Sequence, residues 1–283
     1  MLKRRKAIRW QRAISKVLSY TVAYGYALII LFPLTFMALT AFKPRYELFA
    51  YPPTFLPREW TLDNFQRVFQ TMPYATFLKN TLLVTAAVVL CQLALSATAS
   101  FAFARLRFRG RDALFALLLI SLMVPSAVTM VPTYILMRSL GWINEYWGVI
   151  VPMIFSNIAF GVFFMRQYLY GIPVEIEEAA AIEGASTLRL WWSIILPNCR
   201  PALATLAVIT FVTAWNAFLW PLIVLNSQDK FVLSIGLMYM QGQYSTDWAG
   251  IMAGTLVTVL PIVVAYVVLQ KHFVEAVHMS GIK

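Results

Sequence analysis

Long apolar stretches constrain the fold of this chain more than any other feature. A bilayer core is about 30 Å thick, and a helix needs about 20 apolar residues to cross it. The segments that reach this length are 17–42, 77–103, 113–137, 147–165, 201–225 and 249–269. Their apolar runs are continuous instead of alternating, which favours helices over barrel strands. The sequence therefore predicts an all-α, polytopic membrane protein with six transmembrane helices in one domain, residues 1–283.

Composition and charge support this prediction and orient it. The chain is 60% hydrophobic and 12% charged, which argues against a soluble globule. The basic N-terminus precedes an apolar run too long for a signal peptide, with no small-residue cleavage site, so a retained helix is expected. Of the 23 Lys and Arg residues, 16 lie in the N-terminus, segments 105–111 and 166–200, and the C-terminal tail. The positive-inside rule places these parts in the cytoplasm.

Several functional classes lose support from what the sequence lacks. The interiors of the predicted spans hold no Asp, Glu, Lys, Arg or His, the residues that proton pumps and intramembrane proteases need at depth. The phosphate-loop pattern does not occur, so ATP would have to be held by a partner. Cys91 and Cys199 form neither a disulfide pattern nor a metal site. The net charge of +11 is accounted for by topology and anionic lipid, without a nucleic acid.

A polar, Ala-rich segment, EAAAIEGASTLRLWWSIILP, stands out at 178–197 between apolar blocks. Pro173 can open a helix whose first turn carries negative charge that complements the helix dipole. Gly184 can end that helix in a left-handed conformation, Ser186 can cap a second one, and Pro197 is expected to end it. The segment therefore predicts a bent helix pair just outside the bilayer. Its residue types suit equally an interfacial connector and a contact that transmits movement from a partner.

At these residues the chain resembles the permease subunits of bacterial ABC importers. Their pattern E-A-A-x3-G-x9-I-x-L-P is matched at each specified position, by Glu178, Ala179, Ala180, Gly184, Ile194, Leu196 and Pro197. The flanking sequences RQYLYGIPVEIEEAA and FVTAWNAFLWPLIVL are similar to the carbohydrate branch, in particular to the smaller permease of maltose-type systems. One departure is the ending HMSGIK, where the family often has more glycine.

The resemblance implies a type I ABC importer permease fold in the bacterial inner membrane, with both termini cytoplasmic. A second permease subunit would complete the pathway as a heterodimer, two ATPase subunits would hold ATP and Mg²⁺, and an extracytoplasmic binding protein would deliver the cargo. This chain would be non-catalytic, with no cofactor or metal of its own. The loop at about 166–200 would couple it to the ATPase, with Glu178 paired to a basic residue there. The external segment at about 43–76 and the loop 226–247 are candidate docking surfaces for the binding protein.

Cargo contacts are expected from neutral polar and aromatic side chains within the spans, because a sugar offers hydroxyl groups and an apolar ring face. The candidates are Ser156, Asn157, Trp215, Asn216 and Phe218. Hydrogen bonding between helices is an alternative role for the two asparagines. A sugar or oligosaccharide is the expected cargo. The alternatives are glycerol-3-phosphate or another polyol derivative, and a facilitator that works without partners.

Proline residues predict breaks in three spans. Each proline removes a backbone hydrogen bond and can kink its helix. Pro125 and Pro132 are expected to interrupt the third span, Pro221 lies near the end of the fifth, and Pro261 is expected to divide the sixth. Ordinary bundle packing explains any one of them equally well.

Overall fold

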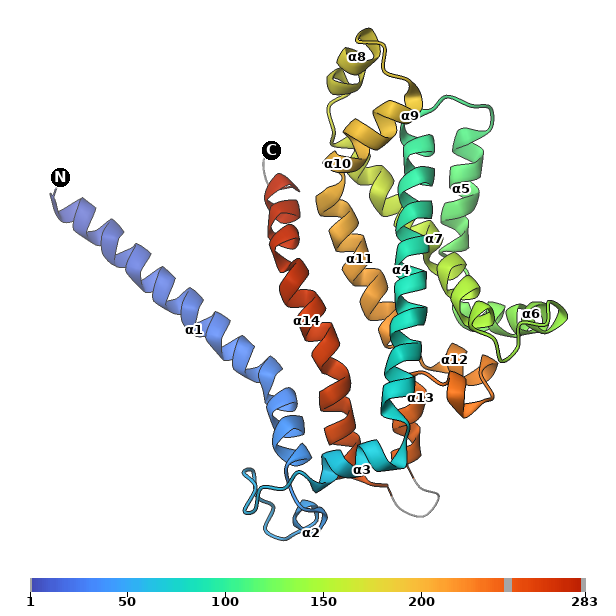
Figure 1. Cartoon of the computed structure of the whole chain (residues 1–283). Coiled ribbons are helices and arrows are strands. Elements are labelled where there is room, and N and C mark those ends of the chain that lie inside the picture. Colours follow the sequence, from blue (N-terminus) through green and yellow to red (C-terminus); the bar gives the residue numbers. More distant parts are fainter. Residues whose placement is uncertain (1, 242–245, 281–283) are drawn as a thin grey trace. The chain divides into compact units, whose positions relative to one another are not determined.

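A computed structural model describes residues 2–241 and 246–280, and regular structure in this part of the chain is helical apart from an isolated bridge between Gln241 and Thr246. Figure 1 labels the longer elements. In chain order the helices are α1 (Leu2–Ala41), α2 (Arg45–Leu48), α3 (Asp63–Thr71), α4 (Tyr74–Arg105), α5 (Arg111–Ser121), α6 (Ser126–Ser139), α7 (Tyr146–Tyr170), α8 (Glu175–Ile182), α9 (Thr187–Leu190), η1 (Trp191–Ile195), α10 (Leu196–Asn198), α11 (Arg200–Trp215), α12 (Leu219–Val224), η2 (Gln228–Lys230), α13 (Leu233–Gly236), η3 (Leu237–Met240) and α14 (Trp248–Ser280).

The predicted all-α membrane architecture is confirmed. Three helical segments are long and apolar enough to cross a bilayer: Ile14–Ala41, Tyr74–Arg105 and Tyr146–Tyr170. Two further candidates are helix pairs bent at a break, by 100° between Arg111–Ser121 and Ser126–Ser139 and by 71° between Thr187–Asn198 and Arg200–Trp215. The sixth predicted span corresponds to the shorter apolar segment Trp248–Val264 within α14.

The prolines break some spans and leave others continuous. The third span is interrupted between Ser121 and Ser126, where Pro125 has no N–H to donate and biases the preceding residue away from helical angles. The fifth ends at Trp215 and restarts at Leu219, because the ring of Pro221 would clash with a helical carbonyl four residues earlier. Pro132 and Pro261, by contrast, lie inside continuous helices, so the prediction that they interrupt theirs was wrong.

The chain divides into two compact units, Met1–Met72 with Met240–Val257, and Pro73–Tyr239 with Thr258–Lys283. In the second unit, α4 packs along α7, and α11 packs against both. Two apolar clusters form its core. One joins α4, α7 and α12 through Val88, Val149 and Val224. The other joins α4, α7 and α11 near Leu169 and Leu206. Within this unit, the α4–α5 turn and the α8–α9 loop lie at the same end (Figure 1).

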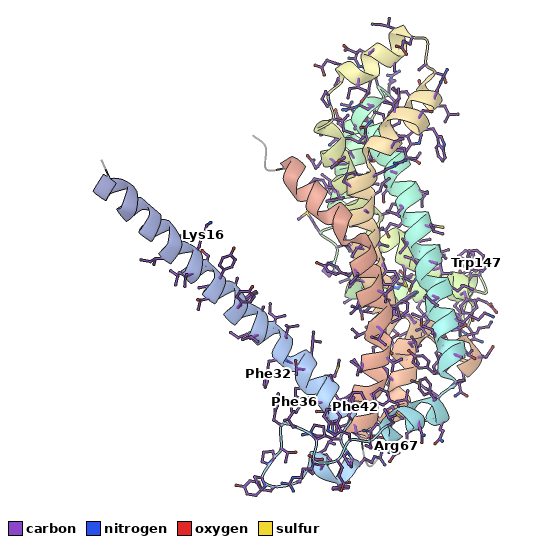
Figure 2. The ribbon with its side chains drawn as sticks, turned by 60° about the vertical axis from the view of Figure 1, so that its left-hand side comes forward. Lys16, Phe32, Phe36, Phe42, Arg67 and Trp147 are labelled. Carbon is purple, nitrogen blue, oxygen red and sulfur yellow. The ribbon has the colours of Figure 1, made fainter. Side chains whose placement is uncertain are left out.

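The first unit folds the predicted external segment against the end of α1. This segment contains the short helix α3. Its Asn64 side chain donates to the carbonyl oxygens of Ala41 and Lys43, at 2.7 and 2.8 Å, and so ties α3 to the residues that follow α1. Phe42 packs on the rings of Trp60 and Phe65. Figure 2 labels Phe42 at the end of α1. This external segment is therefore an ordered structure.

Candidate functional site

The loop between α7 and α11 has the predicted bent-helix geometry. Gly184 adopts a left-handed conformation, with φ of 81°. Its N–H donates to Ala181 O and the N–H of Ala185 donates to Ala180 O, both at 3.0 Å, which is the Schellman pattern that closes a helix C-terminus. Ser186 then caps α9 by accepting the N–H of Arg189 at 3.4 Å. The chain therefore turns sharply at Gly184, a residue that has no Cβ atom.

The sequence predicts that the second helix of the loop ends at Pro197, but in the structure the helix does not end there. It passes through the π-helical turn η1, where the N–H of Leu196 donates to Trp191 O, and continues through Pro197 to Asn198. The wider turn suits this position, because the proline has no N–H and its ring excludes an ordinary bond to the carbonyl four residues earlier. The sharp bend comes instead at Cys199, where α11 begins.

The motif residues divide between an outer and an inner face of the loop. Glu178, Ala179 and Gly184 are exposed, whereas Ala180 is buried. The remaining members are half-buried: Ile194, Leu196 and Pro197. The outer face also carries apolar side chains that contact solvent: Ile182 is 88% exposed and Leu188 is 74% exposed. An exposed apolar tip beside an acidic first turn is typical of a surface that another protein covers.

The inner face of the loop is anchored to the membrane helices by apolar packing. Trp191 and Ile195 are buried in the cluster that includes Leu169 of α7 and Leu206 of α11. The Trp191 ring lies 4.9 Å from the ring of Phe101 in α4, measured between centroids. Movement of the second half of the loop is thus opposed by contacts with three spans.

The residues predicted to contact cargo are not brought together in one site. Ser156 lines a cavity of about 290 Å³ with Trp220 and with residues of α6 and α7. The backbone carbonyl oxygen of Asn157 accepts from Gln92 Nε2 at 2.8 Å, whereas the Asn157 side chain donates to Met153 O of its own helix at 3.2 Å. Trp215 is buried and donates to Thr258 O at 3.1 Å. Asn216 bonds back to Val212 O at 2.9 Å, and Phe218 is the residue before α12.

The cavity around Ser156 has the chemistry that a neutral polyhydroxyl ligand requires. Its lining residues are uncharged and include the hydroxyl side chains of Ser126, Thr129, Thr133 and Ser156. Three of these hydroxyls donate to carbonyl oxygens of their own helices, so their oxygen lone pairs can accept from a ligand. The cavity lies where α6 and α12 begin, at the two breaks in the spans. The cavity at these two breaks thus combines hydroxyl groups with apolar side chains.

A polar stripe on α4 was not predicted, because neutral polar residues were considered only in the predicted spans 147–165 and 201–225. The buried members are Asn80, Thr81, Thr85, Gln92, Ser96 and Ser100. Their recurrence at intervals of mostly four residues on one helix face would have been the sequence signal. Asn80 donates to Asp229 O and Phe231 O, at 2.7 and 2.9 Å, and so fixes the loop before α13.

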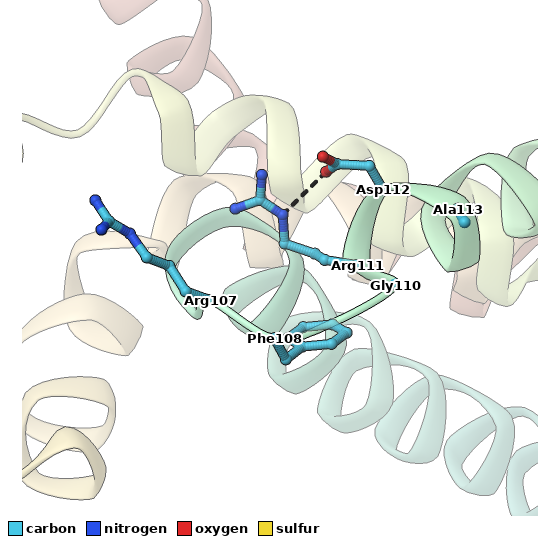
Figure 3. Close-up of a pocket in the computed structure, with 6 residues that line it drawn as sticks. All are labelled: Arg107, Phe108, Gly110, Arg111, Asp112 and Ala113. Carbon is cyan, nitrogen blue, oxygen red and sulfur yellow. Dashed lines mark hydrogen bonds and ion pairs between the residues drawn. The ribbon is translucent and has the colours of Figure 1, made fainter.

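The α4–α5 turn forms a second, more open cavity of about 420 Å³. Figure 3 shows Arg107 and Arg111 on its lining, with Arg111 paired to Asp112 at 3.0 Å. Gly110 permits the tight turn, with φ of 81°. These residues belong to one of the basic segments that the positive-inside rule assigned to the cytoplasm.

Comparison with known proteins supports the resemblance seen in the sequence. The chain is 36% identical over 279 residues to "Arabinooligosaccharides transport system permease protein AraQ" of Halalkalibacterium halodurans, covering 96% of this chain and 99% of that protein. It is 32% identical over 267 residues to "sn-glycerol-3-phosphate transport system permease protein UgpE" of Escherichia coli O1:K1 / APEC, covering 92% and 94%.

The fold has a counterpart among solved structures. A crystal structure of a bacterial ABC transporter involved in the import of the acidic polysaccharide alginate contains a chain that matches with a TM-score of 0.80 and 23% identity, over 92% of this chain and 96% of that one. Residues 92–278 match the family described as "Binding-protein-dependent transport system inner membrane component". That stretch includes the whole α8–α10 loop. The chain therefore belongs to the family of binding-protein-dependent transport system inner membrane components.

Proposed function

We propose that this chain is the pathway-forming permease subunit of an ATP-driven importer of a sugar or oligosaccharide, coupled to a separate ATPase through the α8–α9 loop. The observation that carries the proposal is the outer face of that loop. Glu178 and Ala179 are exposed on α8, Gly184 turns the chain, and exposed Ile182 and Leu188 supply apolar contact area. A short rigid helix with these features fits a cleft of a partner subunit.

In this proposal the ATPase subunits hold ATP and Mg²⁺, and this chain is not catalytic. Glu178 pairs with a basic residue of the ATPase, and the left-handed turn at Gly184 keeps α9 clear of that contact. Both termini and the coupling loop are cytoplasmic, as the distribution of Lys and Arg indicates. Closure of two ATPase subunits on ATP then pushes the loop and switches the pathway between its outward and inward openings.

The remaining partners follow from the family. A second permease forms the other half of the pathway as a heterodimer, and an extracytoplasmic binding protein delivers the cargo. The ordered segment 43–76 offers it one docking surface. The loop 226–247 offers another, although residues 242–245 of it lie outside the described part of the chain. The tail after Lys271 begins within α14, which continues to Ser280.

A neutral sugar is the cargo that the cavity favours. The residues that line the space around Ser156 are uncharged, and Trp220 adds an indole to its hydroxyl groups. Glycerol-3-phosphate is the second candidate, because a relative with 32% identity is named for its transport. A phosphate would need a cation, which in this proposal the other permease would supply.

The test is reconstitution of the chain with its partners. Mild detergent extraction of the tagged chain is expected to co-purify an ATPase subunit and a second permease. Proteoliposomes of that complex, supplied with the binding protein, should import radiolabelled arabinotriose, or maltose, in an ATP-dependent manner, while sn-glycerol-3-phosphate competes poorly. Transport by this chain alone, without ATP, would instead establish a facilitator. Preferential uptake of sn-glycerol-3-phosphate would overturn the neutral cargo.

A further inference from the structure

The last residue of α4, Arg105, joins three segments at the end of the second unit. Its Nε donates to Glu177 Oε1 of α8 at 2.5 Å. Its Nη2 donates to Leu169 O at 2.8 Å and to Ile172 O at 2.9 Å, at the C-terminal end of α7. The guanidinium of Arg105, at the end of α4, thus bonds to α8 and to the end of α7.

The ion pair is shielded from water. The side chains of Arg105 and Glu177 are each 10% exposed. A buried pair of this kind contributes little net stability, but removing one partner leaves a charge that nothing compensates. Arginine is suited to the position, because its planar fork can serve a carboxylate and two carbonyl oxygens at once, whereas lysine presents a single ammonium group. The α7 carbonyls also lie at the negative end of a helix dipole.

Few other side chains tie α8 to the rest of the unit. Of its residues, Glu177 and Ala180 are buried, at positions three apart that face inward, whereas Glu178, Ala179 and Ile182 are exposed. The second half of the loop is held by apolar packing of Trp191 and Ile195. The two halves of the loop are therefore attached differently. Apolar packing holds the second half, and a directional polar contact with Arg105 holds the first.

We infer that Arg105 is a positioning residue for coupling, which transmits displacement of α8 to α4 and α7 together. The inference rests on the proposed function, since it assumes that an ATPase subunit moves α8. Side chains in an apolar contact can shift past one another. A guanidinium that is bonded to two carbonyl oxygens and a carboxylate instead fixes both the distance and the orientation between α8 and the membrane helices. Movement of α8 consequently carries the ends of both membrane helices with it.

The test compares three variants in proteoliposomes that contain the complete complex. The double variant Arg105→Met with Glu177→Met removes both charges and fills the space with apolar side chains, which is compatible with folding. Arg105→Lys keeps a cation but loses the fork. Arg107→Met removes one exposed Arg from the same turn and is the matched control. The measurement is ATP hydrolysis with and without the purified binding protein, normalised to the amount of inserted complex.

Basal hydrolysis is expected to stay at the wild-type level in each variant, because the ATPase is unaltered. Stimulation by the binding protein is expected to fall about tenfold in the double variant and by a smaller factor in Arg105→Lys, with Arg107→Met unchanged. A merely structural role would reduce the amount of complex and leave stimulation per complex intact. Wild-type stimulation in the double variant overturns the inference. If that variant does not accumulate, wild-type stimulation in Arg105→Lys overturns it.

The wild-type complex separates this inference from the proposed function. A wild-type chain that recruits no ATPase, or whose ATPase ignores the binding protein, contradicts the proposed function itself. A wild-type complex that responds normally, with variants that respond equally well, contradicts the role of Arg105 alone.

Discussion

At the scale of single residues, the coupling loop depends on one backbone conformation. Gly184 has a φ of 81°, and an added Cβ there would meet nothing within 4 Å. The cost of a larger residue in this chain is therefore conformational, about 1–2 kcal/mol for the left-handed region. In our proposal, a partner subunit lies against the exposed surface at Gly184. A substitution at Gly184 can act by straining the backbone or by sterically excluding the partner, and two different substitutions separate these effects.

Gly184→Leu is expected to abolish transport while the protein still inserts, since the side chain both strains the turn and occupies the docking surface. Gly184→Asn is the matched comparison, because asparagine tolerates the left-handed region and is smaller. It should retain more ATPase subunit in co-purification than the leucine variant. Normal uptake by Gly184→Leu, measured per inserted protein, would exclude this loop from coupling.

At the scale of elements, close packing between α4 and α7 fixes how two spans meet. A Cβ added at Gly161 of α7 would overlap Ser96 Oγ and lie 3.1 Å from Ser96 Cβ. Gln92, one turn away, donates across the same interface to Asn157 O. Ser96 Oγ and Gln92 Oε1 are buried without a hydrogen-bond partner. Close packing, together with hydrogen bonds between the two helices such as the one from Gln92, therefore sets the register of these helices.

Gly161→Ala is expected to lower the stability of the protein by about 1–3 kcal/mol, because the interface has no room for the methyl group. Ser96→Ala should be close to neutral, since it removes an oxygen that has no partner, and the two changes together should recover part of the loss. Thermal unfolding in detergent measures each variant. Gly25→Ala, where an added Cβ meets nothing within 4 Å, is the control. Equal midpoints for Gly161→Ala and this control would contradict the packing argument.

At the scale of the whole molecule, segments far apart in the sequence meet at charged side chains. In the first unit Asp247, 7% exposed, accepts from Arg45, Arg67 and the N–H of Gly250. Burial alone would raise the pKa of Asp247, but these donors outweigh it and hold the pKa below the ordinary value. The residues that the carboxylate joins are separated by up to 202 positions. Asp247 therefore links the two segments of the first unit, which lie far apart in the sequence.

This lowered pKa gives a pH dependence with a definite sign. A group whose pKa is depressed on folding contributes stability above the ordinary carboxyl pKa of about 3.9, and that contribution is lost as the pH falls through the lowered folded-state value. Wild-type protein should therefore lose thermal stability between about pH 5 and about pH 2, and Asp247→Asn should lose less over the same range. The comparison is needed because a hydrogen bond from Thr54 also lowers the pKa of Glu47. Parallel pH profiles for the two proteins would contradict this account.

The sequence determined the features that consecutive residues encode. Apolar length predicted the membrane spans, the left-handed preference of glycine predicted the turn at Gly184, and the capping preference of serine predicted the second helix after Ser186. These succeed because length, proline and glycine act on the local backbone. The same rules left the effect of each proline open, since Pro125 breaks its span while Pro261 does not.

Only the tertiary structure decided which distant residues meet. The first turn of α8 carries Glu175, Glu177 and Glu178, and the α4–α5 segment carries several arginines, so the sequence offers many equivalent ion pairs. The structure selects Arg105 and Glu177, which are 72 positions apart. Successive residues of a helix point about 100° apart, so the way α8 packs on the bundle turns the Glu177 carboxylate inward and leaves Glu178 exposed. Helical phase against a neighbouring element is set by packing, and no local pattern contains it.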